Sequence, residues 1–219
     1  MKGADVMPSS NNDTSAALSA ATKLRQRLSE TDDLILLPGV YDGFSARIAL
    51  EIGFDGLSTW LGLPHLGFAT LDDMRSHAEM LANLDPSIPL VADADTGYGG
   101  LNMVARTVTQ YARSGVAGLH IEDQVQTKRC GHLTGKQHGA TPSWTAAEAK
   151  ALGFRMMIVP FAAIAPAHNA IRASLVKLKE TGEVGTRPDF SPRKLFSIVG
   201  LQEAVDFDAA AGGSSYSEL

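Results

Sequence analysis

Residues 89–123 read PLVADADTGYGGLNMVARTVTQYARSGVAGLHIED and contain two apolar strands separated by one helix. The first predicted strand, residues 89–92, runs into a glycine-rich turn, and the predicted helix, residues 101–114, is closed by Gly115. The second predicted strand covers residues 117–121. A strand, a crossover helix and a second strand make a parallel βαβ unit. Both strands are apolar at successive positions rather than at alternate ones, which is typical of a sheet that is buried on both faces.

The same alternation of strands and helices continues on both sides of this unit. Further strands are predicted at residues 33–38, 55–58 and 154–159. Further helices are predicted at residues 16–30, 43–52, 71–84, 145–152, 162–181, 191–196 and 201–211. The first strand is predicted to end at the turn signal Pro38–Gly39. Thr70 is the predicted N-cap of the third of these helices, with Asp73 completing an imperfect capping box. The pattern indicates a parallel sheet covered by helices, either a barrel or an open doubly wound sheet.

The composition is that of a globular domain with a modest negative charge. The 219 residues suffice for one domain with a sizeable core. We expect a disordered tail at residues 1–15, one βα domain at residues 16–211 and a tail at residues 212–219. A formal net charge of -5 without a long basic run argues against nucleic acid and against a charged membrane surface as partners. The longest apolar stretch, residues 156–165, is broken by Pro160 and is too short to cross a bilayer.

The termini and the single cysteine indicate the compartment. Residues 1–20 lack the apolar core of a secretory signal and have too few arginines for a transit peptide. The last four residues, Tyr-Ser-Glu-Leu, do not form the peroxisomal tripeptide. One cysteine excludes an internal disulfide framework and fits a reducing compartment. We therefore expect a cytoplasmic protein, with a mitochondrial location left open.

Acidic side chains follow two of the predicted strands at the point where each strand ends. Asp93 and Asp95 follow the first, and in an extended chain residues two positions apart point to the same side. Glu122 and Asp123 follow the second, and the carboxyl ends of parallel strands share one edge. Oxygen clusters suit hard cations such as Mg²⁺ or Mn²⁺. The plainer alternatives are surface charge for Glu122, and for Asp95 a helix cap or the start of the glycine-rich turn, which has neither a dinucleotide nor a P-loop motif.

The segment KRCGH, residues 128–132, lies in a long polar loop behind these acids. Two cations beside the thiol of Cys130 favour the thiolate. His132 can relay a proton, and Lys128 or Arg129 can bind a carboxylate. The alternative is a solvated basic loop. Because cysteine and histidine are interleaved with the cations a few residues after the acids, the pattern favours a functional loop.

Several of these segments resemble the isocitrate lyase/phosphoenolpyruvate mutase superfamily. The matching segments are VADADTGYGG (91–100), GLHIEDQ (118–124), KRCGH (128–132), PGVYDGFSARIALEIGFDG (38–56), LGLPHLGFATLDDM (61–74) and HGATPSWTAAEAKALGFRMMIVPFAA (138–163). They occur in the family's order and span nearly all of residues 20–219. The resemblance implies an α/β fold, the (β/α)₈ TIM-type barrel, in a homo-oligomer, a dimer or tetramer whose subunits swap a C-terminal helix.

The resemblance also implies a chemistry. The family makes or breaks C–C bonds, or P–C bonds in some members, next to carboxylates with Mg²⁺ or Mn²⁺, and the cysteine loop is similar to that of its lyase and hydrolase branches. The substrate would be a small carboxylate of the 2-methylisocitrate, dimethylmalate or oxaloacetate type. The implied catalytic residues are Cys130 as acid/base, with Lys128, Arg129 and His132. The implied substrate-binding residues are Asp93, Gly131, Gly139 and Thr141. The implied metal ligands are Asp93, Asp95, Glu122 and His65.

The chain departs from the family pattern in three places. His65 stands where the family usually has an acid that supports the metal. No Ser/Thr-Gly segment that would bind a substrate carboxylate is visible at residues 57–60, and Gln137 runs directly into His138 where the family has several βα units. Five predicted strands instead of eight indicate the same shortening. We therefore predict an incomplete barrel, the product of altered splicing, an imperfect gene model or decay.

Three functions follow from this sequence. The first is a Mg²⁺-dependent C–C bond lyase or hydrolase. The second is a catalytically impaired or inactive shortened family member with an interaction role. The third, an open-sheet binding protein, explains the strand order but does not explain KRCGH, and we rank it last.

Overall fold

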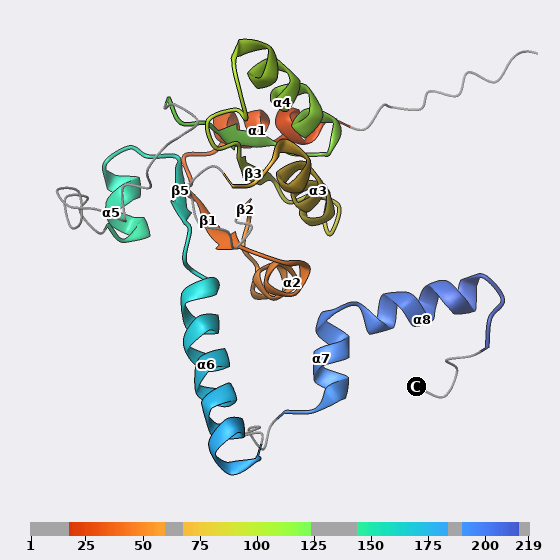
Figure 1. Cartoon of the computed structure of the whole chain (residues 1–219). Coiled ribbons are helices and arrows are strands. Elements are labelled where there is room, and N and C mark those ends of the chain that lie inside the picture. Colours follow the sequence, from red (N-terminus) through yellow and green to blue (C-terminus); the bar gives the residue numbers. More distant parts are fainter. Residues whose placement is uncertain (1–17, 60–67, 124–143, 184–189, 215–219) are drawn as a thin grey trace, which may run out of the picture.

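The computed structural model describes residues 18–59, 68–123, 144–183 and 190–214 of the chain. In these parts one five-stranded sheet has the order β4-β3-β2-β1-β5 (Figure 1). The strands are β1 (Ile35–Val40), β2 (Leu57–Thr59), β3 (Leu90–Asp93), β4 (Gly118–His120) and β5 (Met156–Val159). Every pairing between neighbours is parallel, so the predicted parallel sheet of five strands is confirmed.

The sheet is a curled half-barrel rather than a doubly wound sheet. Strands β1 to β4 follow one another across the sheet in chain order, and β5 returns to the other side of β1. The pairing of β1 with β5 joins Ile35 to Met156 and Pro38 to Val159. In a complete barrel the last strand closes on the first in this way. The predicted incomplete TIM-type barrel is confirmed.

The helices of the described residues follow the predicted order, with limits that differ by a few residues. They are α1 (Ala20–Glu30), α2 (Gly43–Ile52), α3 (Leu71–Ala82), α4 (Leu101–Arg113), α5 (Ala146–Ala151), α6 (Ile164–Thr181), α7 (Pro192–Ile198) and α8 (Leu201–Ala210). The limits of α2 agree at both ends, because Asp42 caps its start and Gly53 closes it with a φ of 93°. The capping box of α3 is complete, since Thr70 and Asp73 make both hydrogen bonds although aspartate has the shorter side chain.

Strand β1 does not end at Pro38–Gly39, as the sequence suggested, but continues to Val40. Gly39 lies so close to the end of β5 that a Cβ atom there would overlap the carbonyl group of Pro160. Glycine therefore lets β1 pass the end of β5 and pair with Ser58 of β2. The prediction was wrong because it took the Pro-Gly pair as a turn signal, whereas this glycine permits a close approach of two strands.

Apolar side chains are buried on both faces of the sheet. One face packs against α2, α3 and α4, and the other face carries α1. Leu90 and Ala92 belong to the first cluster, whereas Val91 between them packs with Leu24 of α1. Successive side chains of a strand point to opposite faces. This double burial explains why the strands are apolar at successive positions.

The sheet edges and the C-terminal helices are more exposed than this core. No residue of α6, α7 or α8 is buried, and α6 projects away from the sheet (Figure 1). The edge strands β4 and β5 are only partly buried. Large exposed apolar side chains include Leu101, Phe154, Phe161, Ile171, Leu175 and Phe207. Among the helices of the described ranges, none has the length and apolar character that a membrane span requires.

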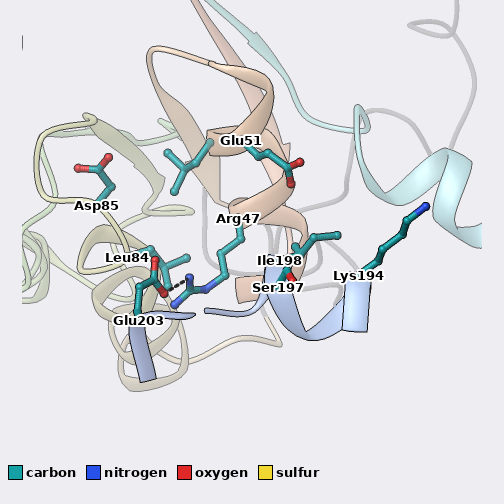
Figure 2. Close-up of a pocket in the computed structure, with 9 residues that line it drawn as sticks. Arg47, Glu51, Leu84, Asp85, Lys194, Ser197, Ile198 and Glu203 are labelled. Atoms are coloured by element: carbon teal, nitrogen blue, oxygen red, sulfur yellow. Dashed lines mark hydrogen bonds and ion pairs between the residues drawn. The ribbon is translucent and has the colours of Figure 1, made fainter. Parts of the chain in front are cut away.

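The C-terminal arm, formed by α7 and α8, meets the rest of the chain at α2. Arg47 of α2 and Glu203 of α8 form an ion pair of 3.2 Å (Figure 2). The cleft beside this pair has a volume of about 690 Å³, and side chains of both charges line it. Asp85, on its wall, precedes the start of β3, so the cleft lies away from the carboxyl ends of the strands. We assign it no ligand, because its charges are mixed and its ion pair is exposed to solvent.

Candidate active site at the carboxyl ends of β3 and β4

Two strand ends meet at the carboxyl edge of the sheet. Asp93, the last residue of β3, is in register with His120, the last residue of β4. The Oδ1 atom of Asp93 lies 3.6 Å from Nδ1 of His120. Beyond the strands, the amide of Glu122 donates a hydrogen bond of 2.7 Å to the carbonyl of Asp95. The structure thus brings the two acidic strand ends together, as the sequence predicted.

Hydrogen bonds fix the orientation of Asp93. Its amide donates to the hydroxyl of Thr59, which ends β2, at 3.0 Å. Its Oδ1 atom accepts from the amide of Asp95 at 2.8 Å, and its carbonyl accepts from the hydroxyl of Tyr111 at 2.8 Å. The side chain is 15% exposed, so part of the carboxylate reaches solvent at the edge. Asp93 is therefore presented to the edge in one defined direction.

Asp95 lies in a left-handed turn and not in an extended continuation of β3. Its φ is 48°, so the argument that Asp93 and Asp95 share one side as strand neighbours was wrong. The amide of Asp95 turns back onto the Asp93 carboxylate, and the amide of Gly97 donates to the carbonyl of Ala94 at 2.8 Å. Asp95 does not cap the next helix either, since Gly100 is the N-cap of α4. The other part of that alternative, a place in the glycine-rich turn, is confirmed.

The carboxylates at this edge are candidate ligands of a divalent cation. Asp93, Asp95 and Glu122 supply oxygen atoms, the ligands that Mg²⁺ and Mn²⁺ prefer. Within the ranges that the structure describes, no three His, Cys, Asp or Glu side chains form a group that could hold a metal ion. The predicted set of three carboxylates is therefore not assembled as such. Mg²⁺ is usually bound through one or two carboxylates and keeps several waters, so the donors that are present fit the chemistry of such an ion.

The remaining predicted site residues lie outside the described parts of the chain. They are His65, Lys128, Arg129, Cys130, Gly131, His132, Gly139 and Thr141. The predicted polar loop over residues 124–143 falls there as well. The roles that the family resemblance implies for these residues stay predictions.

Sequence reasoning did not single out four polar side chains of this edge. His120 faces Asp93, and the alternation of side chains along β4 would have placed it on the same side as the acid two residues later. Thr59 reaches Asp93 from the neighbouring strand. The hydroxyls of Tyr98 and Tyr111 lie 3.2 Å apart. Only the folded turn brings these two tyrosines together, so no sequence pattern indicated them.

Burial keeps both tyrosines protonated. Removal from water raises the pKa of Tyr111 to about 12 and also raises the pKa of Tyr98, because the phenolate is poorly solvated there. Near neutral pH both side chains are therefore hydroxyl donors rather than bases. A cleft of about 380 Å³ opens beside Tyr98, between α3 and α4.

Comparisons with known proteins agree with this geometry. The model of the phosphoenolpyruvate phosphomutase family matches residues 24–175. An isocitrate lyase of Haloferax volcanii is 42% identical over 125 residues, which are 53% of this chain and 36% of that protein. A crystal structure of 2,3-dimethylmalate lyase matches with a TM-score of 0.86 and 38% identity, over 92% of this chain and 98% of that chain. A structure of oxaloacetate acetylhydrolase with the inhibitor 3,3-difluorooxalacetate matches with a TM-score of 0.84 and 38% identity, over 90% and 99% of the two chains.

The matches cover different shares of this chain and of the proteins that it resembles. The chain spans little more than a third of the isocitrate lyase that it matches, in sequence. The superposed structures nevertheless follow the half-barrel over most of its length. The family model covers well over half of the 219 residues. The chain belongs to the isocitrate lyase/phosphoenolpyruvate mutase superfamily.

Proposed function

We propose that this chain is a C–C bond lyase or hydrolase that acts on a small 2-hydroxy or 2-oxo di- or tricarboxylate with Mg²⁺ or Mn²⁺. The observation that carries the proposal is the carboxyl edge of the half-barrel, where Asp93, held by hydrogen bonds, faces His120. The backbones of Asp95 and Glu122 are hydrogen-bonded to each other at the same edge. Open ends of parallel strands are where βα folds bind their ligands. The similar structures are a dimethylmalate lyase and an oxaloacetate acetylhydrolase, which supports an acid of this size as the substrate class.

Asp93, Asp95 and Glu122 are the proposed ligands of the divalent cation, with His65 as a further one. Because such an ion usually binds one or two carboxylates directly, the remaining acids would reach it through water. When bound, such an ion supplies positive charge that offsets the negative charge developing beside a substrate carboxylate. The part of Asp93 in this site is to present its carboxylate in one direction, which the hydrogen bond from the amide of Asp95 and the bond of its own amide to Thr59 support. Preorganised groups of this kind avoid reorganisation during the reaction.

The loop KRCGH supplies the proposed proton-transfer groups. In the lyase direction, the C–C bond beside the hydroxyl-bearing carbon breaks, and that carbon becomes a carbonyl as its hydroxyl proton passes to solvent through His132. The electron pair of the broken bond stays on the carbon next to a carboxylate. The thiol of Cys130 then gives its proton to that carbon. Lys128 and Arg129 bind a substrate carboxylate and His132 relays the proton, while contacts to substrate are proposed for Gly131, Gly139 and Thr141. Closure of the loop excludes water from the charged site.

The proposal is tested by turnover. The purified chain is incubated with Mg²⁺ or Mn²⁺ and with 2-methylisocitrate, dimethylmalate or oxaloacetate, and released pyruvate, succinate or oxalate is measured. We expect product from one of these acids, and loss of product in Cys130→Ser and in the metal-free protein. Asp85→Asn, on the opposite end of β3, is the matched control for a lost carboxylate and should keep full activity. Absence of turnover with all acids while metal binding is retained would instead support the inactive, interacting family member.

We further propose a homo-oligomer, a dimer or tetramer, in a reducing compartment such as the cytoplasm. The exposed apolar side chains of α6, α7 and α8 support a contact between subunits through the C-terminal helices. The single cysteine supports the reducing compartment. Multi-angle light scattering of the purified chain measures the oligomeric state.

A further inference from the structure

The turn that carries the acids is strained. We call residues 93–99 the acidic turn. Two of its non-glycine residues, Asp95 and Tyr98, have left-handed φ values of 48° and 62°. For most residues with a Cβ atom this conformation costs about 1–2 kcal/mol, and because aspartate tolerates it better, the larger cost falls on Tyr98. Such conformations persist only where the surrounding structure over-determines them, and they gather at functional sites.

Side chains of α4 hold the acidic turn in place. The buried hydroxyl of Tyr111 donates to the carbonyl of Asp93 at 2.8 Å, and Tyr98 lies 3.4 Å from the same carbonyl. One helical turn earlier, the hydroxyl of Thr107 lies 3.2 Å from the carbonyl of Gly97. Tyr111 and Thr107 are each 1% exposed. Helix α4, which has 13 residues, thus contacts the turn from its buried side at two carbonyls. Tyr111 makes the shorter contact, because the hydroxyl of Thr107 also lies 2.9 Å from the carbonyl of Met103 in its own helix.

The contact with Tyr111 completes the fixation of Asp93. Thr59 accepts from the amide of Asp93 on one side of its Cα atom, and Tyr111 donates to the carbonyl on the other side. Both peptide groups that flank this Cα atom are therefore held by buried side chains. Because the direction of a side chain follows from the backbone that carries it, this fixes where the Asp93 carboxylate points. The same peptide unit leads into the strained conformation of Asp95.

We propose that Tyr111 is a positioning residue of the site, whose hydroxyl, supported by Tyr98, holds the acidic turn in the form that binds the cation. The inference rests on the proposed function in one respect, namely that the acidic turn is the place where the cation binds. Partners of this kind, which orient a ligand without touching the metal, typically contribute a factor of about 10–100 to metal affinity. A tyrosine that merely filled the core would contribute through its ring and not through its hydroxyl.

The substitution Tyr111→Phe separates the two roles, because it keeps the ring and removes the hydroxyl. Val116→Ala is the matched control, since Val116 is buried in the same cluster and its truncation leaves the hydroxyl of Tyr111 in place. In the metal-free proteins, amide hydrogen exchange of Asp95 and Glu122 reports the turn, and exchange of Leu37 in β1 reports global opening. We expect exchange at Asp95 and Glu122 to rise about tenfold more than at Leu37 in Tyr111→Phe, and to rise in parallel with Leu37 in Val116→Ala.

A titration with Mn²⁺, followed by electron paramagnetic resonance, is the second readout. We expect Tyr111→Phe to bind Mn²⁺ about tenfold more weakly than Val116→Ala does. Unchanged exchange at Asp95 in Tyr111→Phe, or equal Mn²⁺ affinity of the two variants, would overturn the positioning role. A wild-type chain that binds no Mn²⁺, with the exchange pattern as expected, would leave the role of Tyr111 in the turn standing and overturn the metal site of the proposed function.

Discussion

At the scale of single residues, the site combines a strained backbone with a fixed carboxylate. Asp95 sits at a positive φ and close in the backbone to two other acids, Asp93 and Glu122. Like charges gathered at one edge destabilise the folded chain when no cation is bound. A residue that is unfavourable in both respects is typical of a functional site that has been kept at some cost in stability.

Asp95→Asn should separate stability from binding. Asparagine tolerates the left-handed conformation, and it removes one negative charge from the edge. We expect the free energy of unfolding of the metal-free chain to be unchanged or up to about 0.5 kcal/mol higher, because one of the like charges at this edge is removed. Affinity for Mn²⁺ should fall at least about tenfold. Urea denaturation and a Mn²⁺ titration measure the two effects, and a variant that is less stable yet binds Mn²⁺ normally would contradict this view of Asp95.

Sequence reasoning found the acids but not their conformation. Asp93, Asp95 and Glu122 were indicated by their positions after apolar strands, a pattern that local sequence carries. The left-handed turn and the hydrogen bond from Tyr111 to the carbonyl of Asp93 depend on the packing of α4 against the turn. No local sequence pattern indicates such a contact. The expectation that Asp93 and Asp95 point to the same side, which assumed an extended chain after the strand, was wrong for this reason.

At the scale of elements, strand and helix order could be predicted because each element carries its own period and its own caps. The limits of α2 agreed because Asp42 and Gly53 are strong end signals. The predicted end of β1 was wrong because glycine is needed at position 39 for a tertiary contact. The backbone of Pro160, at the end of β5, approaches Gly39 closely, and the sequence does not show this approach. Features that depend on contacts between elements distant in the chain, such as the end of β1, could therefore not be predicted from the sequence.

Gly39→Ala tests that close approach. The new methyl group would overlap the backbone of Pro160 and push β5 from β1, so we expect a loss of about 2 kcal/mol in the free energy of unfolding. Gly43→Ala is the matched control, because its methyl group would meet only the end of the flexible Met80 side chain in the first turn of α2. Thermal and urea unfolding measure both variants. Equal stability of Gly39→Ala and the wild-type chain would show that β1 and β5 are not packed this closely.

His77 joins α3 to the end of β1 and should make stability depend on pH. Its Nε2 atom lies 3.0 Å from the carbonyl of Tyr41, and its Nδ1 atom is buried with no hydrogen-bond partner among the described residues. Burial, which outweighs the carbonyl of Tyr41 and the charge of Asp42, lowers the pKa of His77 below its ordinary 6.5. The unfolded chain therefore binds the proton more tightly. This contribution to stability is complete above pH 6.5, decreases as the pH falls below it, and levels off below the folded pKa.

The variant His77→Gln isolates this effect, because an amide donor can still reach the Tyr41 carbonyl without titrating. We expect urea unfolding of the wild-type chain to show decreasing stability from pH 7 to pH 5, with a shallower decrease in His77→Gln. His168→Gln, on the exposed surface of α6, is the control and should keep the wild-type slope. A slope that is the same in all three proteins would exclude His77 as its source.

At the scale of the whole molecule, the half-barrel leaves apolar surface that a complete barrel would bury. The strands β4 and β5 form the two edges of the sheet, and neither is fully buried. Ile171, Leu175 and Leu178 of α6 are 55%, 60% and 39% exposed and lie at helical spacing on one face. Exposed apolar side chains that share one face of a helix are typical of interaction surfaces.

The apolar stripe of Ile171, Leu175 and Leu178 predicts self-association through α6. Leu175→Glu places a charge in the middle of the stripe and should shift the chain toward smaller species in light scattering across a concentration series. Lys177→Glu, about half a helical turn away on the same exposed helix, is the control and should leave the distribution unchanged. A wild-type chain that stays monomeric at every concentration, or equal dissociation of both variants, would show that the apolar stripe of α6 does not mediate self-association.

On the proposed function, the carboxyl edge of this half-barrel holds a divalent cation on Asp93 and the acids beside it. Titration of Mn²⁺ into the purified chain, followed by electron paramagnetic resonance, tests it most directly, with Asp93→Asn as the site variant and Asp85→Asn as the control. We expect a single saturable Mn²⁺ per chain, bound at least about tenfold more weakly by Asp93→Asn and with unchanged affinity by Asp85→Asn. No saturable binding by the wild-type chain, or equal binding by the wild-type chain and Asp93→Asn, would contradict it.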